Sequence, residues 1–314
     1  MRLIRNNSNP VLEKGCVATI GNFDGLHLGH QAIFNQLKKR AQELGLPSAV
    51  ITFEPLPKEH FSKKNPELAL SRLTRFKEKW QYLEKIGIDW MVCLHFHAQL
   101  AEWTASHFVH HLLLEKLNVK LLIVGEDFHF GHSREGDLAF LEVCAQKNGF
   151  ILEMADTQLL EGTRISSTRV REALKRNDLG LAEKLLGRLY TVSGKVIHGD
   201  KQARQWGFPT ANLTVHRSIL PTLLPVKGVY AVLVDIPGST NLPGVANVGY
   251  RPTVNGFRHL LEVHLLNFND TLYDKNINVK FVHKIREEQR FDSLALLKEK
   301  ILEDVEIAKH YFRC

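Results

Sequence analysis

The chain has 314 residues, of which 44% are hydrophobic and 24% charged, a composition that is typical of a folded protein with room for two domains. No segment approaches the roughly 18 consecutive apolar residues of a membrane span, the N-terminus has no apolar leader, and the four cysteines form no C-x-x-C pair, so we expect a cytoplasmic protein without a zinc site or a disulfide framework. The net charge of +7 is compatible with nucleic acid or with polyphosphate substrates and does not distinguish them.

The first predicted strand and helix meet at a glycine-rich turn. An apolar run at 16–20 precedes Gly-Asn-Phe-Asp-Gly-Leu-His-Leu-Gly-His at 21–30, and apolar residues then recur at helical spacing over 33–44. Amides at a helix N-terminus bind phosphate, and glycine permits close approach of a ligand. His27 and His30 are three residues apart and can face one ligand. We interpret the turn as a nucleotidyl-transfer site, where imidazoles stabilise charge moving to pyrophosphate; an ordinary turn with surface histidines is the alternative.

The first half continues with alternating strand and helix signals. Strands are expected at 48–53, 90–94 and 121–124, with a helix near 73–86 and further helical patterns between them. This βαβ order predicts a parallel sheet.

Two more loops in this half carry groups that suit phosphate. Residues 125–131 follow a strand, at the edge where open α/β sheets bind ligands. Residues 164–168, Arg-Ile-Ser-Ser-Thr, place hydroxyl groups before a helical run at 170–175, beside Arg169 and Arg171. Taken alone, residues 164–168 could be an ordinary helix cap. That alternative is weaker because the same domain has two other segments with groups that suit phosphate, at 21–30 and 125–131.

The pattern changes after the leucine pair that ends at residue 186. Short alternating segments broken by Gly, Pro and Asn now replace the βαβ order, and they lie at 190–197, 228–234, 260–266 and 277–281. A helical segment follows over 293–312. We expect an antiparallel barrel with a terminal helix, and a domain boundary between residues 186 and 187.

A second group of polar residues lies in the predicted barrel. In Gly-Phe-Pro-Thr-Ala-Asn-Leu at 207–213, alternation places Thr210 and Asn212 on one side of an extended segment, where both can offer oxygen ligands to Mg²⁺. A turn that enters a strand is the alternative. Further along, Glu262 and His264 share the face opposite three apolar side chains, so Glu262 is either a general base or part of a solvated strand.

Together these motifs resemble the bacterial bifunctional riboflavin kinase/FAD synthetase family over residues 15–312. Four segments are similar to its adenylyltransferase module: GNFDGLHLGH at 21–30, TFEPLP at 52–57, VGEDFHFG at 124–131 and ISSTRVR at 165–171. Four others are similar to its kinase module: GFPTANL at 207–213, VANVGYRPT at 245–253, LEVHLL at 261–266 and the later IREEQRFDSL.

The resemblance implies an α/β, Rossmann-like nucleotidyltransferase domain at 1–186, followed by an all-β, six-stranded riboflavin kinase barrel with a C-terminal helix at 187–314. It implies phosphorylation of riboflavin to FMN in the second domain, and adenylylation of FMN to FAD with release of pyrophosphate in the first. ATP and the flavins are then substrates and products, and Mg²⁺ is the cofactor. No nucleic acid, membrane or obligatory protein partner is expected.

The resemblance also implies roles for individual residues. His27 and His30 would be catalytic in adenylyl transfer, and Glu262 would accept the proton of the ribityl hydroxyl. The residues expected to bind ATP or its phosphates in the first domain are Gly21, Asn22, Phe23, Asp24, Gly25, Asp127, Arg164, Ser166, Ser167, Thr168 and Arg171. Those expected to bind ATP or flavin in the second domain are Gly199, Lys201, Gly207, Phe208, Pro209, Asn247 and Arg286. Thr210 and Asn212 would hold Mg²⁺.

Four residues depart from the family pattern: His129, Ala203, Asn267 and Asp274. We expect effects on loop conformation and affinity, most of all at Asp274, because a residue other than glycine resists positive φ. One alternative function is a single-activity nucleotidyltransferase with a flavin-binding regulatory barrel. Another is an RNA-binding protein, which would need aromatic residues interleaved with basic ones on its strands.

Overall fold

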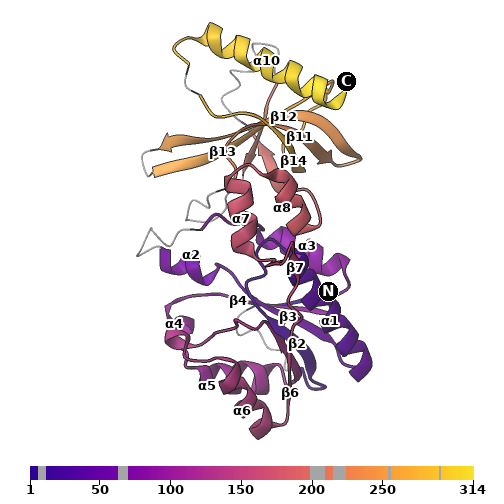
Figure 1. Ribbon diagram of the computed structural model, residues 1–314, viewed down its shortest axis with the longest axis vertical. Helices are drawn as coiled ribbons and strands as arrows, with labels where there is room; N and C mark the ends of the chain where they lie inside the picture. Colours follow the sequence, from indigo (N-terminus) through magenta and orange to yellow (C-terminus); the bar gives the residue numbers. More distant parts are fainter. Residues whose placement is uncertain (6–11, 63–69, 199–208, 215–223, 254–255, 290) are drawn as a thin grey trace. The chain divides into compact units, whose positions relative to one another are not determined.

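A computed structural model (Figure 1) describes the chain outside residues 6–11, 63–69, 199–208, 215–223, 254–255 and 290. The chain divides into two compact units, each described here by itself. The first unit is Met1–Ala69 with Thr74–Ser167, and the second is Leu70–Leu73 with Thr168–Cys314. No helix in the described part of the chain is long and apolar enough to cross a membrane.

The first unit is built on a six-stranded sheet with the order β1-β4-β3-β2-β5-β6. All neighbouring strands are parallel, which confirms the prediction from the βαβ pattern. The strands are β1 (Arg2–Arg5), β2 (Cys16–Ile20), β3 (Ser48–Phe53), β4 (Trp90–Leu94), β5 (Val119–Val124) and β6 (Ile151–Met154).

Helices cover both faces of this sheet because successive side chains of its central strands point to opposite faces. Val17 packs with Phe34 and Leu37 of α1, whereas its neighbour Ala18 belongs to a second cluster with Leu112. The helical segments are α1 (Leu28–Leu44), α2 (Pro57–Ser62), α3 (Phe76–Lys85), α4 (Ala98–Ala101), α5 (Ala105–His107), the π-helix η2 (Phe108–Lys116), the 3₁₀ turn η3 (His132–Arg134) and α6 (Leu138–Asn148). A small hairpin of β7 (Leu159–Leu160) and β8 (Thr163–Arg164) follows.

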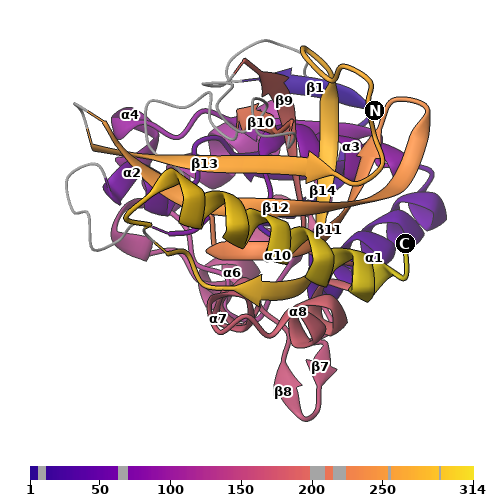
Figure 2. The same cartoon turned by 90° about the horizontal axis from the view of Figure 1, so that it is seen from above.

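The second unit contains a closed antiparallel barrel with the order β10-β13-β12-β11-β14-β9. Its strands are β9 (Thr191–Ile197), β10 (Ala211–Thr214), β11 (Gly228–Ile236), β12 (Ser239–Thr253), β13 (Gly256–Leu265) and β14 (Asn276–Arg286). The last helix, α10 (Leu294–Phe312), lies across the barrel (Figure 2), where Val305 and Ala308 pack against Val229 and Ala231 of β11. The predicted barrel with a terminal helix is confirmed.

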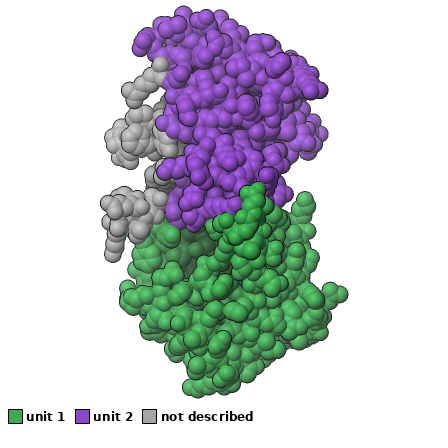
Figure 3. Space-filling view, viewed as in Figure 1, with its two compact units in different colours: residues 1–69, 74–167 green, residues 70–73, 168–314 purple. Residues whose placement is uncertain are grey.

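Two short helices, α7 (Ser167–Lys175) and α8 (Leu179–Leu186), precede the barrel. Apart from Ser167, they cluster with it in the second unit (Figure 3). The Tyr230 hydroxyl in β11 donates to Asn177 Oδ1 at 2.7 Å, and α8 packs next to β14. The boundary expected between residues 186 and 187 therefore follows helices that contact the barrel.

We expect a fragment of residues 168–314 to unfold at a higher temperature than a fragment of residues 187–314. The longer fragment keeps α8, whose Leu185 and Leu186 are at most 1% exposed, and it keeps the Asn177 acceptor. Burial of one leucine contributes about 1.5–3 kcal/mol, which corresponds to a shift of roughly 5 °C or more in a domain of this size. Thermal melts of the two fragments test this, and equal melting temperatures would instead support a boundary at residue 187.

Candidate functional sites

The glycine-rich turn at 21–30 follows β2 and leads into α1, as predicted. His27 is the N-cap of α1, and its Nδ1 accepts a hydrogen bond from the backbone N–H of His30 at 3.3 Å. A neutral His27 ring therefore carries its hydrogen on Nε2. The two rings are stacked with centroids 3.6 Å apart. The structure brings the two histidines together at a helix N-terminus, where the helix dipole favours an anion.

The first residues of the turn lie in contrasting environments. Asn22 is exposed, whereas Phe23 is 2% exposed and its ring contacts those of His30 and Phe34, with centroids 5.2 and 4.9 Å away. A Cβ atom on Gly21 would lie 3.1 Å from the Phe23 ring, so a larger residue would push the ring aside. Phe23 thus supports the histidines from the core side of the turn.

Side chains from other loops fix the middle of the turn. The Asp24 carboxylate is 2% exposed and accepts from Thr74 N at 2.9 Å, while Gly25 N donates to Thr74 Oγ1 at 3.0 Å. The Ser167 hydroxyl donates to the Asp24 carbonyl oxygen at 2.7 Å. Asp24 and Ser167, both expected to serve phosphate binding, therefore set the shape of the turn.

The two other loops of the first unit meet through an ion pair. Arg164 Nη2 donates to Asp127 Oδ1 at 2.7 Å, and the guanidinium lowers the pKa of that carboxyl. Both side chains are largely exposed, so we expect the pair to orient the loops rather than to contribute much stability. Ser166 directly precedes α7, in agreement with the predicted placement of hydroxyl groups at a helix start.

Two predicted phosphate-binding residues lie in the part of α7 that belongs to the second unit. Thr168 is exposed in the first turn of that helix. Arg171 Nε donates to the Ser71 carbonyl oxygen at 2.7 Å, so one of its donors holds the chain segment at 70–73.

A cavity of about 590 Å³ opens at the carboxyl ends of β5 and β6. It is lined by Gln36, Glu126, Glu153, Met154, Ala155, Asp156 and Thr157. Its position matches the edge at which open α/β sheets bind ligands. Glu126 belongs to the loop at 125–131, so this predicted loop forms one wall of a cavity.

In the barrel, three predicted residues form a row across neighbouring strands. Asn212 of β10 pairs with Glu262 of β13, and Glu262 pairs in turn with Asn247 of β12. Directly opposed residues of antiparallel strands project from the same face, with Cβ atoms about 5 Å apart. Asn212 is only 8% exposed, and Thr210 immediately precedes β10. The register thus assembles a carboxylate between two carboxamides.

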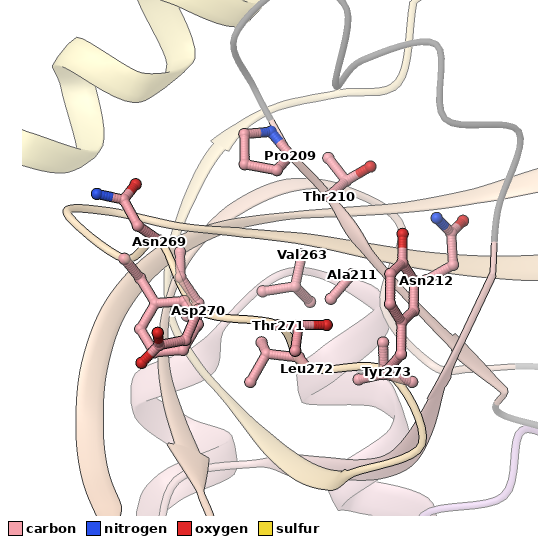
Figure 4. A pocket seen from close by; sticks show the side chains of 13 residues that line it. Pro209, Thr210, Ala211, Asn212, Val263, Asn269, Asp270, Thr271, Leu272 and Tyr273 are labelled. Carbon is pink, nitrogen blue, oxygen red and sulfur yellow. The ribbon is translucent and has the colours of Figure 1, made fainter.

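A cavity of about 320 Å³ is lined by one member of this row, Asn212 (Figure 4). Its walls include residues 209–212, Val263, Leu265 and the loop at 268–273. His264 Nδ1 lies 3.0 Å from the Pro209 carbonyl oxygen, and burial lowers the pKa of His264, which favours the neutral ring. The neutral ring then donates its Nδ1 hydrogen and fixes the segment that carries Thr210.

Other predicted residues of the barrel are engaged elsewhere or are not described. Arg286 donates from Nε and Nη2 to the two carboxylate oxygens of Asp304, both at 2.7 Å, and Asp304 on α10 is 3% exposed. This bidentate pair attaches the end of β14 to α10, and a ligand-binding role for Arg286 remains a prediction. Four predicted residues lie outside the described part of the chain: Gly199, Lys201, Gly207 and Phe208.

Comparison with known proteins decides the family. The family model of FAD synthetase matches residues 9–169, and that of riboflavin kinase matches residues 186–312. The bifunctional riboflavin kinase/FMN adenylyltransferase of Haemophilus influenzae is 47% identical and covers 99% of each chain. The chain belongs to this family. Members from Escherichia coli K12 and Pseudomonas fluorescens are 46% and 49% identical, and each alignment spans at least 97% of both chains.

A solved structure shares the fold of nearly the whole chain. The crystal structure of the macrolide-efflux protein from Streptococcus pneumoniae is similar over 98% of both chains, with a TM-score of 0.79 and 29% sequence identity. The resemblance to the riboflavin kinase/FAD synthetase family, first inferred from short motifs, is therefore confirmed, as is the expected pair of folds.

Two of the four departures from the family pattern lie at residues with positive φ. Asp274 has φ +64°, so the position where the family favours glycine does require the left-handed region. Its carboxylate pairs with Lys195 Nζ at 2.7 Å, which lowers the pKa of Asp274. Asn267 also has positive φ, at +53°, a conformation that asparagine tolerates better than most residues. His129 Nδ1 contacts the carbonyl oxygen of Asp127 at 3.0 Å, and Ala203 lies outside the described residues.

A group of aromatic rings at the carboxyl ends of β3 and β4 was missed in the sequence. Phe53, His60, Phe61 and Phe96 form it, with neighbouring ring centroids 5.4 to 5.8 Å apart. Phe61 is 46% exposed although it is large and apolar. The motif at 52–57 marked this region, but only the pairing of β3 with β4 shows that the later Phe96 joins it.

Proposed function

We propose that the chain carries out both reactions of its family, the phosphorylation of riboflavin to FMN in the barrel and the adenylylation of FMN to FAD in the α/β unit. The observation that carries the proposal is that each unit holds its own set of reactive side chains. His27 and His30 lie together at a helix N-terminus in one unit, and Glu262 lies between Asn212 and Asn247 in the other. Both sets lie within the segments matched by the corresponding family models.

In adenylyl transfer, a phosphate oxygen of FMN attacks the α-phosphorus of ATP and the bond to pyrophosphate breaks. The nucleophile is already anionic, so the reaction needs neutralisation of charge more than a base. His27 and His30 would donate to the phosphate oxygens, on which negative charge builds up as pyrophosphate leaves. The N-terminal end of α1 adds its positive dipole end to this effect.

The aromatic group formed by Phe53, His60, Phe61 and Phe96 would receive the flat isoalloxazine ring of FMN. Aromatic rings stack favourably, and the exposure of Phe61 leaves apolar surface for such a ligand. The group lies at the carboxyl edge of the same sheet from which the turn at 21–30 begins.

In the kinase reaction, Glu262 would take the proton of the ribityl hydroxyl while its oxygen attacks the γ-phosphorus of ATP and ADP leaves. An alcohol is a weak nucleophile, so a base at this position contributes directly to the rate. Thr210 and Asn212 would hold Mg²⁺, which neutralises phosphate charge when it is bound. Their hydroxyl and carboxamide oxygens, both in the wall of one cavity, are the neutral hard ligands that suit Mg²⁺ alongside phosphate and water.

The test is product analysis after incubation with riboflavin, ATP and Mg²⁺. We expect FMN to appear first and FAD to follow, and we expect EDTA to stop both steps until Mg²⁺ is restored in excess. Conversion of supplied FMN to FAD without any FMN formed from riboflavin would favour a single-activity nucleotidyltransferase with a flavin-binding barrel. The substrates are small soluble molecules, so we also propose a cytoplasmic enzyme that needs no nucleic acid, membrane or protein partner.

A further inference from the structure

Lys79 is a buried lysine that none of the roles above uses. It is the fourth residue of α3 and is 2% exposed. Its Nζ donates to the carbonyl oxygen of Asn22 at 2.6 Å and to Thr52 Oγ1 at 3.0 Å. Removing an ammonium group from water is costly, and a methionine would fill a similar volume without that cost. Packing alone therefore does not explain a lysine at this position.

Both acceptors lie where the glycine-rich turn begins. Asn22 follows β2, and Thr52 is near the end of the neighbouring strand β3. The Thr52 hydroxyl itself donates to the Asn22 carbonyl oxygen at 3.4 Å, and Gly21 N donates to the Ile51 carbonyl oxygen at 3.1 Å. The ammonium group thus ties the peptide group between Asn22 and Phe23 to the next strand of the sheet.

The turn needs this support because its backbone is unfavourable on its own. Phe23 and Leu26 have φ values of +45° and +48°, a region that side chains with a Cβ resist. Phe23 directly follows Asn22, and its buried ring contacts the His30 ring with centroids 5.2 Å apart. A shift of the Asn22 carbonyl group would therefore move Phe23 and, through it, His30.

The contact also has an electrostatic effect on the turn. The carbonyl group of Asn22 and the N–H of Phe23 belong to one peptide group, so an ammonium bonded to the oxygen polarises that group and makes its N–H a stronger donor. A positive charge next to an anion-binding turn also favours a polyphosphate ligand. Methionine at position 79 would supply neither effect.

We propose that Lys79 is a positioning residue for adenylyl transfer. It fixes the Asn22 peptide and thereby places Phe23 and His30 for their work on the ATP phosphates. The proposal rests on the assignment of adenylyl transfer to this turn, so its test must include a variant that checks that assignment separately.

The experiment compares Lys79→Met with Lys77→Met in the full-length chain. Lys77 lies on the same helix but is exposed, so the same substitution there leaves the turn intact. FAD formation from supplied FMN, FMN formation from riboflavin and the melting temperature are measured for each variant. We expect Lys79→Met to lower kcat for FAD formation by about 10- to 100-fold, the usual range for misplaced groups, with a smaller change in KM for FMN. FMN formation should stay unchanged, and Lys77→Met should behave as the unmodified enzyme.

Thr52→Val gives a second test that preserves the ammonium group. It removes the hydroxyl that bonds both Lys79 and the Asn22 carbonyl oxygen, while keeping the size of the side chain. We expect a smaller fall in kcat, of about 3- to 10-fold, and the loss in the double variant should be less than the product of the single losses because both residues act on one peptide. A merely structural role would lower the melting temperature but leave kcat of the folded enzyme unchanged.

His30→Ala separates failure of this proposal from failure of the assigned function. Normal FAD formation in Lys79→Met, together with its loss in His30→Ala, would overturn the positioning role alone. Normal FAD formation in His30→Ala would overturn the assignment of the turn. If Lys79→Met does not fold, Thr52→Val decides the matter, and an unchanged kcat for FAD formation in that variant would overturn the proposal.

Discussion

Replacing His30 with alanine is expected to lower the rate of FAD formation by about 10²-fold or more, the usual cost of one lost donor to a transition state. His30 lies in the first turn of α1 with its ring stacked on that of His27. FMN formation from riboflavin should be unaffected, because the proposed kinase residues belong to the other unit. Initial rates of the two half-reactions in one preparation provide the measurement.

The neighbouring His27 requires a different substitution. Its Nδ1 caps α1 by accepting from His30 N, so alanine at position 27 would remove a helix cap worth about 1 kcal/mol as well as an imidazole. His27→Asn retains an acceptor at the cap and should lose FAD formation with little change in melting temperature. His110→Ala, at an exposed position, is the matched histidine control. Unchanged FAD synthesis in His30→Ala would mean that the turn is not the adenylyl-transfer site.

The strands that could be predicted are those with a strong local signal. Residues 48–53 and 90–94 are mostly apolar, and both form largely buried strands with the expected bounds. The strand Arg2–Arg5 was not predicted because its sequence has only two apolar residues between two arginines. Its strand conformation is stabilised by pairing with β4, nearly ninety positions later in the chain. That pairing is a tertiary effect, and the hydrophobic pattern of a short segment does not contain it.

The candidate sites also differ in whether neighbouring residues or distant strands bring their side chains together. Spacing alone places His27 and His30 at one helix start, because three residues span almost one helical turn. The row of Asn212, Glu262 and Asn247 depends instead on the register of three strands, and a slip of one residue would turn a strand's side chains to the opposite face.

Lys79 and Arg286 show why the remaining contacts were missed or remain undecided. A lysine on the polar side of a helical pattern is typical of a solvated face, and only the fold shows that this one is buried under a turn fifty-seven positions away. Arg286 fits a family motif, but its guanidinium bonds Asp304 at two points. Tertiary packing decides which acceptor an arginine binds. A short sequence motif therefore does not predict the pairing of Arg286 with Asp304.

Replacing Glu262 with glutamine is expected to lower FMN formation by roughly 10²- to 10⁴-fold, the range for loss of a general base. Glutamine keeps the shape and most hydrogen bonds of the side chain but does not accept the proton of the ribityl hydroxyl. FAD formation from supplied FMN should be nearly unchanged, since that reaction is assigned to the other unit. Glu299→Gln, on the exposed side of α10, is the control for the same chemical change away from the barrel strands.

A thermal melt of Glu262→Gln distinguishes the chemical role from a structural one. Glu262 is half-buried on the face of β13 opposite the buried residues Leu261 and Val263, so the substitution leaves the barrel interior intact. The stability cost should therefore stay within about 0.5 kcal/mol, as for surface substitutions away from a packed core. Near-normal kinase rates would restore the interpretation of Glu262 as part of a solvated strand. A large fall in melting temperature with loss of both activities would instead mean that Glu262 holds the row of Asn212 and Asn247 together, and the base would then have to be another residue.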